Sequence, residues 1–180
     1  MEFKTLEGSS KWLQSLLGSI AKSGHIEFEH NRSKVLVTFP ENLLSLQRFC
    51  SGILDYFPAQ DQSELLLWIS RWDTYPPGPN ILFDKLRKGC GETRPLIETP
   101  GSVFGINDEE ERELLAGFLF LISAFNWECY VVSKVDDKYL YFGDKCVAFF
   151  GDGLLSREWP KQYIEQFGVR IIADMKEAWK

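Results

Sequence analysis

The sequence has few histidines and cysteines, and their positions exclude the common metal and redox motifs. Two histidines, His25 and His30, and four cysteines occur in the 180 residues. The cysteines form no C-x-x-C pair, which excludes zinc-ribbon and thioredoxin-like motifs. Cys50, Cys129 and Cys146 lie in apolar segments, as free buried thiols usually do. We therefore expect four reduced cysteines and no metal site.

Long apolar runs and an excess of positive charge are also missing. The chain has no stretch of about eighteen apolar residues, and the residues after Met1 contain no apolar signal core. With 26 acidic and 20 basic residues the formal net charge is −6, whereas proteins that bind nucleic acid or anionic membranes need a positive surface. We expect a cytoplasmic protein that binds neither nucleic acid nor membranes, and whose protein partner is basic.

The length and composition indicate one domain. A chain of 180 residues with 44% hydrophobic residues can fill one core but hardly two. We expect residues 1–180 to form a single α+β domain. In this domain an antiparallel β-sheet should pack against a buried central helix, with further helices on its flanks.

The central helix is predicted over residues 107–125. Asn107 or Asp108 can cap its first turn, and the acidic residues that follow lie at the positive end of the helix dipole. Apolar residues from 114 to 125 cover nearly the whole circumference, which predicts a helix that is packed on several sides.

Three strands are predicted after this helix, over residues 127–133, 139–142 and 146–150. They are rich in β-branched and aromatic residues, and turn residues separate them. Short strands joined in this way are typical of an antiparallel meander.

The rest of the chain contains weaker patterns. Both a short helix and a buried strand fit residues 62–72, because periodicity does not decide over so few residues, and we favour the strand. The other predicted elements are, in chain order, an amphipathic helix over 9–24, a hairpin over 25–39, a helix over 40–57, a helix over 155–168 and a strand over 169–173.

Residues 71–106 are rich in proline and glycine. Five of the eight prolines and five glycines occur there, around one short amphipathic piece over 81–87. Such a composition predicts a long ordered loop, and long ordered loops are often functional.

This segment also carries the candidate catalytic chemistry. Cys90 is the one cysteine in a flexible, basic neighbourhood, but no histidine lies near it in sequence to make it a nucleophile. Arg87, Glu92, Arg94 and Glu98 alternate in charge, so they can form ion pairs that order the segment, or leave an arginine free to bind an acidic group. We favour ordering. An enzyme of unknown class that uses residues 87–94 is the alternative.

Other catalytic and cofactor motifs are missing. The glycine pairs at 89 and 91 and at 151 and 153 have neither the lysine of a P-loop nor the spacing of a dinucleotide fingerprint. We therefore assign no catalytic residue and expect no cofactor.

Acidic residues gather around the predicted central helix and the strand turns. Charge complementarity speeds the encounter with a basic surface, so these residues are our candidates for partner binding. They are Glu109, Glu110, Glu111, Asp136, Asp137 and Asp144.

Four segments resemble a group of uncharacterised bacterial proteins. They are WISRW at 68–72, LRKGCGETRPL at 86–96, TPGSVF at 99–104 and FNWECY at 125–130, which together with the acidic helix lie within residues 68–130. Small acidic proteins of this sort look like immunity proteins of bacterial toxin systems, which neutralise a toxin by binding it. The resemblance thus implies a non-enzymatic binding protein. A subunit or adaptor of a larger assembly, using exposed aromatics such as Trp12, Trp159 or Trp179, is a further alternative.

Overall fold

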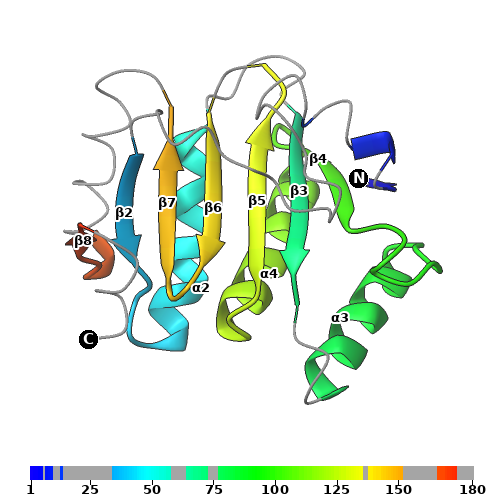
Figure 1. Ribbon diagram of the computed structural model, residues 1–180, viewed down its shortest axis with the longest axis horizontal. Helices are drawn as coiled ribbons and strands as arrows, with labels where there is room; N and C mark the ends of the chain where they lie inside the picture. The colour runs from blue at the N-terminus through cyan, green and yellow to red at the C-terminus, as the bar shows by residue number, and fades with distance from the viewer. Residues whose placement is uncertain are drawn as a thin grey trace.

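An eight-stranded antiparallel β-sheet runs through the centre of the protein (Figure 1). The computed structural model describes residues 1–5, 7–9, 13, 34–57, 64–72, 77–135, 138–151 and 166–173. Across the sheet the strands are β1 (Glu2–Lys4), β4 (Gly101–Gly105), β3 (Glu64–Arg71), β5 (Glu128–Ser133), β6 (Tyr139–Gly143), β7 (Cys146–Phe150), β2 (Lys34–Thr38) and β8 (Ile171–Ile172).

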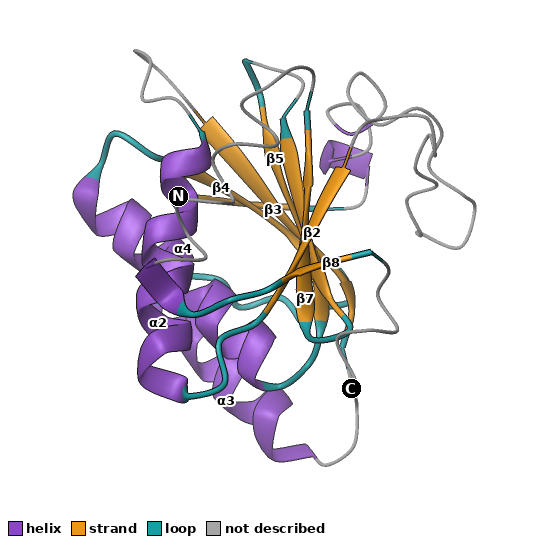
Figure 2. Ribbon diagram, turned by 90° about the vertical axis from the view of Figure 1, so that its left-hand side faces the viewer, coloured by secondary structure: helices purple, strands orange, loops and turns teal. Residues whose placement is uncertain are grey.

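Three helices form a layer on one face of this sheet (Figure 2). They are α2 (Leu43–Gly52), α3 (Pro77–Gly89) and α4 (Glu109–Ala124), and a 3-10 turn (Ile53–Tyr56) continues α2. The predicted α+β domain with an antiparallel sheet packed against helices is confirmed. No helix in the described ranges is both long enough and apolar enough to cross a membrane.

The predicted meander forms the middle of the sheet. Strands β5, β6 and β7 pair in succession, with Tyr130 opposite Tyr141 and Tyr141 opposite Ala148. The five other strands extend this meander on both sides, β3 beside β5 and β2 beside β7. The sequence predicted the local pairings of the meander but not the size of the sheet.

Helix α4 begins where its capping residues predict. The Asp108 carboxylate accepts a hydrogen bond from the backbone N–H of Glu111 at 3.0 Å. Residues on one side of the helix are buried against the sheet and its neighbours, among them Phe118 and Ile122. Contacts with α2, β4 and β5 confirm the predicted packing on several sides, while Gly117 and Ala124 form an exposed stripe. The stripe points away from the sheet because α4 lies in the helix layer.

Both faces of the sheet are buried. One face packs under the helices, and the other carries a second cluster that includes Leu13, Trp68 and the stacked rings of Tyr139 and Phe150, 4.3 Å apart. This explains the continuous apolar run in β3, because a strand that is covered on both faces needs no polar alternation. The strand that we favoured for residues 62–72 is confirmed.

The prediction of a long loop over residues 71–106 was wrong, because the segment contains α3 and β4. Pro77 and Pro79 lie in the first turn of α3, where a missing N–H is tolerated. Gly101 begins β4 where space is short, because a Cβ there would lie 2.5 Å from Ser9 Oγ. Glycine and proline here start regular elements, and the irregular part shrinks to residues 90–100.

The remaining predictions are confirmed in part. Helix α2 and the 3-10 turn account for the helix predicted over 40–57, and β8 lies in the predicted C-terminal strand. Of the hairpin predicted over 25–39, β2 is present, but its neighbours are β7 and β8. The first strand of that hairpin, most of the helix over 9–24 and most of the helix over 155–168 lie outside the described residues. All four cysteines are free thiols, as predicted.

Candidate functional site

Arg87, the first candidate of the 87–94 segment, points into the protein and holds three elements together. Its side chain is 2% exposed. The guanidinium donates to the carbonyl oxygens of Arg94 at 3.2 Å and Thr99 at 2.9 Å, and also to the Thr99 hydroxyl. Asp84 lies 3.5 Å away, and the ring of Phe3 from β1 lies 5.3 Å below the guanidinium carbon. Arg87 therefore ties α3 to the following loop and to the edge of the sheet.

Glu92 and Arg94 form a second, forked pair in the same loop. The Glu92 carboxylate accepts from Arg94 Nε at 2.9 Å, from Arg94 Nη2 at 2.7 Å and from the Arg94 backbone N–H at 2.8 Å. Glu92 is 4% exposed, whereas the Arg94 side chain is 45% exposed. The hydrogen bonds from Arg94 lower the pKa of Glu92 to about 2, although burial alone would raise it. Burial lowers the pKa of Arg87, and the carboxylates of Glu92 and Asp84 oppose that shift.

These contacts predict a pH dependence of stability. A carboxylate whose pKa is lower in the folded state stabilises the fold above its unfolded pKa, near 4.5, and loses that contribution as the pH falls through about 2. We expect the free energy of unfolding of the wild type to fall between about pH 4.5 and pH 2 more steeply than that of Glu92→Gln, in urea titrations at several pH values. Glu98→Gln, which alters an exposed carboxylate of the same loop, should follow the wild-type curve. An identical pH dependence of the free energy of unfolding in the wild type and Glu92→Gln would contradict the lowered pKa of Glu92.

Cys90 lacks the surroundings of a nucleophile. It is half-buried, and burial raises the pKa of its thiol, which reduces the thiolate at neutral pH. His25 and His30 lie outside the described residues. The backbone N–H of Cys90 donates to Leu86 O at 3.1 Å and Arg87 O at 3.0 Å, so Cys90 belongs to the end of α3.

The glycine that follows ends the helix. Gly91 has φ = +88°, and its N–H donates to Lys88 O at 3.0 Å, while Glu92 N–H donates to Arg87 O at 2.9 Å. Left-handed glycines with this bonding pattern are common helix C-caps. The L-R-x-G-x-G-E-x-R stretch thus combines an inward arginine, a helix stop and an ion pair.

The structure does not bring the acidic candidates together. Glu111 turns inward, accepts from the backbone N–H of Gly105 at 2.6 Å and pairs with the amino group of Met1. Glu109 and Glu110 are exposed beside it. Gly105 pairs with Glu64 at the start of β3, so these acids lie at that end of the sheet.

Asp144 lies at the opposite end of the sheet. It follows Gly143 in the turn between β6 and β7. The neighbouring strand β5 begins at this end with Glu128, and Glu128 pairs with Arg71 at the end of β3. With φ = 51°, and Lys145 at 60°, Asp144 serves a tight hairpin turn. Asp136 and Asp137 lie outside the described residues. Of the six predicted partner-binding residues, only Glu109 and Glu110 share an exposed site in the described part of the chain.

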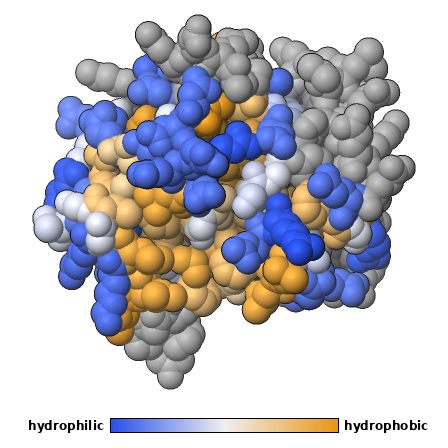
Figure 3. Space-filling model, turned by 180° about the vertical axis from the view of Figure 1, so that it is seen from behind, coloured by the Kyte–Doolittle hydropathy of each residue, from blue (hydrophilic) through white to orange (hydrophobic). Residues whose placement is uncertain are grey.

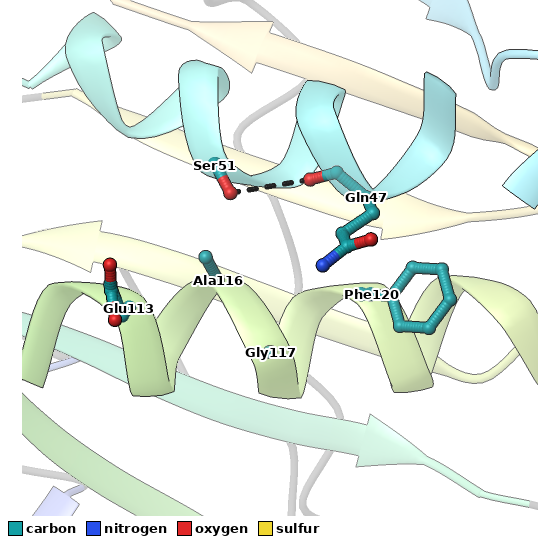
Figure 4. Close-up of a pocket in the computed structure, with 6 residues that line it drawn as sticks. All are labelled: Gln47, Ser51, Glu113, Ala116, Gly117 and Phe120. Carbon is teal, nitrogen blue, oxygen red and sulfur yellow. Dashed lines mark hydrogen bonds between the residues drawn. The ribbon is translucent and has the colours of Figure 1, made fainter. Parts of the chain in front are cut away.

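A groove that the sequence did not predict lies between α2 and α4. Asp55, just after α2, pairs with Arg112 in the first turns of α4, so the two helices run antiparallel. Between them is a hollow of about 290 Å³ (Figure 4). Ser51 and Glu113 lie towards one end of it, and Gln47 and Phe120 towards the other. The residues that line the hollow, which we call the α2/α4 groove, are Gln47, Ser51, Glu113, Ala116, Gly117 and Phe120.

Apolar side chains are exposed on the helices of this layer. Seen from the helix side, apolar surface spreads over the helix layer between hydrophilic borders (Figure 3). Leu43 at the start of α2 is 64% exposed, and Leu44, Ile81 and Leu82 are exposed as well. A signal for this surface was present in the sequence of α2, where Leu43 and Leu44 add apolar residues beyond the buried Leu46, Phe49 and Cys50.

The described residues contain no group of three or more histidine, cysteine, aspartate or glutamate side chains placed to hold a metal ion. Comparisons of the chain with models of known protein families, with curated proteins and with solved structures found no match.

Proposed function

We propose that the protein is a non-enzymatic binding protein whose helix layer docks onto a basic protein domain, and that this domain is a bacterial toxin that it neutralises. The observation that carries the proposal is the outer surface of the helix layer. It combines exposed apolar side chains from α2 and α3 with exposed acids at the start of α4.

This combination has the composition of a protein interface. Contiguous apolar surface on a single chain often marks an interaction site, and interfaces place apolar residues at the centre with polar residues at the rim. Glu109, Glu110 and Glu113 are exposed, and none of the ion pairs among the described residues uses them. They remain available to steer a basic partner towards the apolar surface.

The alternative functions receive less support. The side chains of Arg87, Glu92 and Arg94 are engaged in the contacts that order the loop, so the residues on which the enzyme hypothesis chiefly rests already have a structural role. A subunit of a larger assembly would use the same apolar surface, so a stable complex with further chains of the host would favour that function. Trp12, Trp159 and Trp179, the aromatics considered for it, lie outside the described residues.

A charge-reversal experiment tests the proposal. Glu110→Lys combined with Glu113→Lys should slow association with a candidate basic toxin domain by about tenfold, because steering by complementary charge acts on the on-rate. Raising the salt concentration from 50 to 300 mM should also slow association of the wild type, because salt screens the attraction between the charges. The measurement is binding kinetics on an immobilised toxin domain.

The matched control changes the net charge equally at other places. Glu41→Lys combined with Glu98→Lys reverses two exposed acids outside the first turns of α4 and should leave the on-rate near the wild-type value. Equal slowing by both double variants would show that net charge alone matters. A toxin domain that does not bind the wild type would refute the proposed function.

A further inference from the structure

We infer that the α2/α4 groove receives one helical segment of the partner, with apolar residues at one end of the segment and lysine or arginine at the other. The inference rests on the proposed function and assigns the site and the kind of element that enters it. It is carried by a glycine that the fold does not need, by the gradient of polarity along the groove and by the groove walls.

Gly117 lies in the middle of α4, where glycine lowers helix stability relative to alanine. Its φ is not positive, so the backbone does not require it. A Cβ added at this position would meet no atom within 4 Å, so packing within the protein does not require it either. The missing side chain deepens the floor of the groove. The open space outside Gly117 leaves room for the close approach of a second backbone.

The polarity of the groove changes along its length. At the end where α4 begins, Glu113 lines the groove and Glu109 is exposed one turn before it. At the other end Phe120 lines the groove beside the amide of Gln47, and Leu43, which is 64% exposed, lies one turn before Gln47 on α2. A segment that is basic at one end and apolar at the other matches both ends.

The walls of the groove favour a helix over an extended strand. Both walls are α-helices, whose backbone N–H and C=O groups in the middle are used within the helix, so an incoming strand would find no ladder to extend. Two neighbouring helices with small residues between them instead offer a channel into which the side-chain ridge of a third helix fits. Ala116, Gly117 and Ser51 supply these small residues.

The test uses the full chain and a synthetic helical peptide of 18 residues, with leucines spaced for one face in its N-terminal half and lysines in its C-terminal half. We expect amide chemical shifts of the groove residues to change on titration. Gly117→Ala should weaken peptide binding at least tenfold, although it should raise the melting temperature by about 2–4 °C through its helix propensity. Loss of binding together with a gain of stability is an outcome that unfolding cannot imitate.

Gly89→Ala is the matched control. Gly89 is a helical residue at the end of α3, and a Cβ there also meets nothing within 4 Å, but it lies outside the groove. This variant should bind the peptide like the wild type, and a peptide with glutamates in place of the lysines should bind more weakly to both proteins.

Unchanged peptide affinity in Gly117→Ala, or no binding of the peptide by the wild type, overturns the inference. If the toxin domain binds Gly117→Ala as tightly as the wild type, with an on-rate that still depends on Glu110 and Glu113, the proposed function stands and the groove assignment fails. If the peptide binds in the groove and the toxin domain does not bind at all, the groove assignment stands and the proposed function fails.

Discussion

Phe118→Ala should lower the free energy of unfolding by about 3–5 kcal/mol, because a buried phenylalanine is lost and a cavity remains. Phe118 is 2% exposed on the inner face of α4. Its ring lies 5.2 Å from that of Phe83 in α3 and 5.9 Å from that of Phe104 in β4, centroid to centroid. Three elements therefore meet at this ring. Because domains are stable by only about 5–15 kcal/mol, the loss is a large share of the total.

Phe120→Ala is the control for this prediction. Phe120 lies two residues further along the same helix, is half-buried and lines the α2/α4 groove at the edge of the core, against which it packs on one side. Removing its ring should cost far less stability and should shift the urea midpoint only slightly. The measurement is urea unfolding followed by tryptophan fluorescence and circular dichroism. Equal losses in the two variants would mean that α4 is oriented differently from the structure described here.

The elements that could be predicted from sequence are those fixed by neighbouring residues. The cap at Asp108 and the hairpin turn at Asp144 act within a few positions, so α4 and the meander of β5 to β7 were predicted from local pattern. The placement of β3 between β4 and β5 could not be predicted, because Leu66 pairs with Val103 and Val132 across long stretches of chain. No local signal records such a pairing.

In the candidate site, too, local contacts could be predicted from the sequence and long-range placement could not. Glu92 and Arg94 are two residues apart, and the alternation of charge was enough to suggest their pairing. The carboxylate that pairs with Arg87 is that of Asp84. The two side chains meet because both residues lie on α3, and the proline and glycine content of the segment concealed this helix. The α2/α4 groove depends on how two helices far apart in sequence are placed. The acidic residues were predicted as one set, but the sheet separates Glu110 from Asp144.

Arg87→Ala should destabilise the protein about as strongly as the core variant, by roughly 3–5 kcal/mol. Removing the guanidinium leaves the buried carbonyl oxygen of Thr99 and the partly buried one of Arg94 without this donor, and an unsatisfied buried group costs about 1–3 kcal/mol. It also leaves a void beneath α3, next to Phe3. Arg87→Lys should recover only part of the loss, because an ammonium keeps the charge but not the planar fork.

Arg71→Ala is the matched control for the second prediction. Arg71 also pairs with a carboxylate, that of Glu128 at 2.8 Å, but its side chain is 64% exposed, and exposed ion pairs contribute only about 0–1 kcal/mol. Urea unfolding should therefore separate the two arginine variants clearly, and limited proteolysis should cut residues 90–100 faster in Arg87→Ala alone. If Arg87→Ala unfolds like Arg71→Ala while a binding or catalytic activity disappears, Arg87 acts on a ligand, and the interpretation of this loop as a structural tie is wrong.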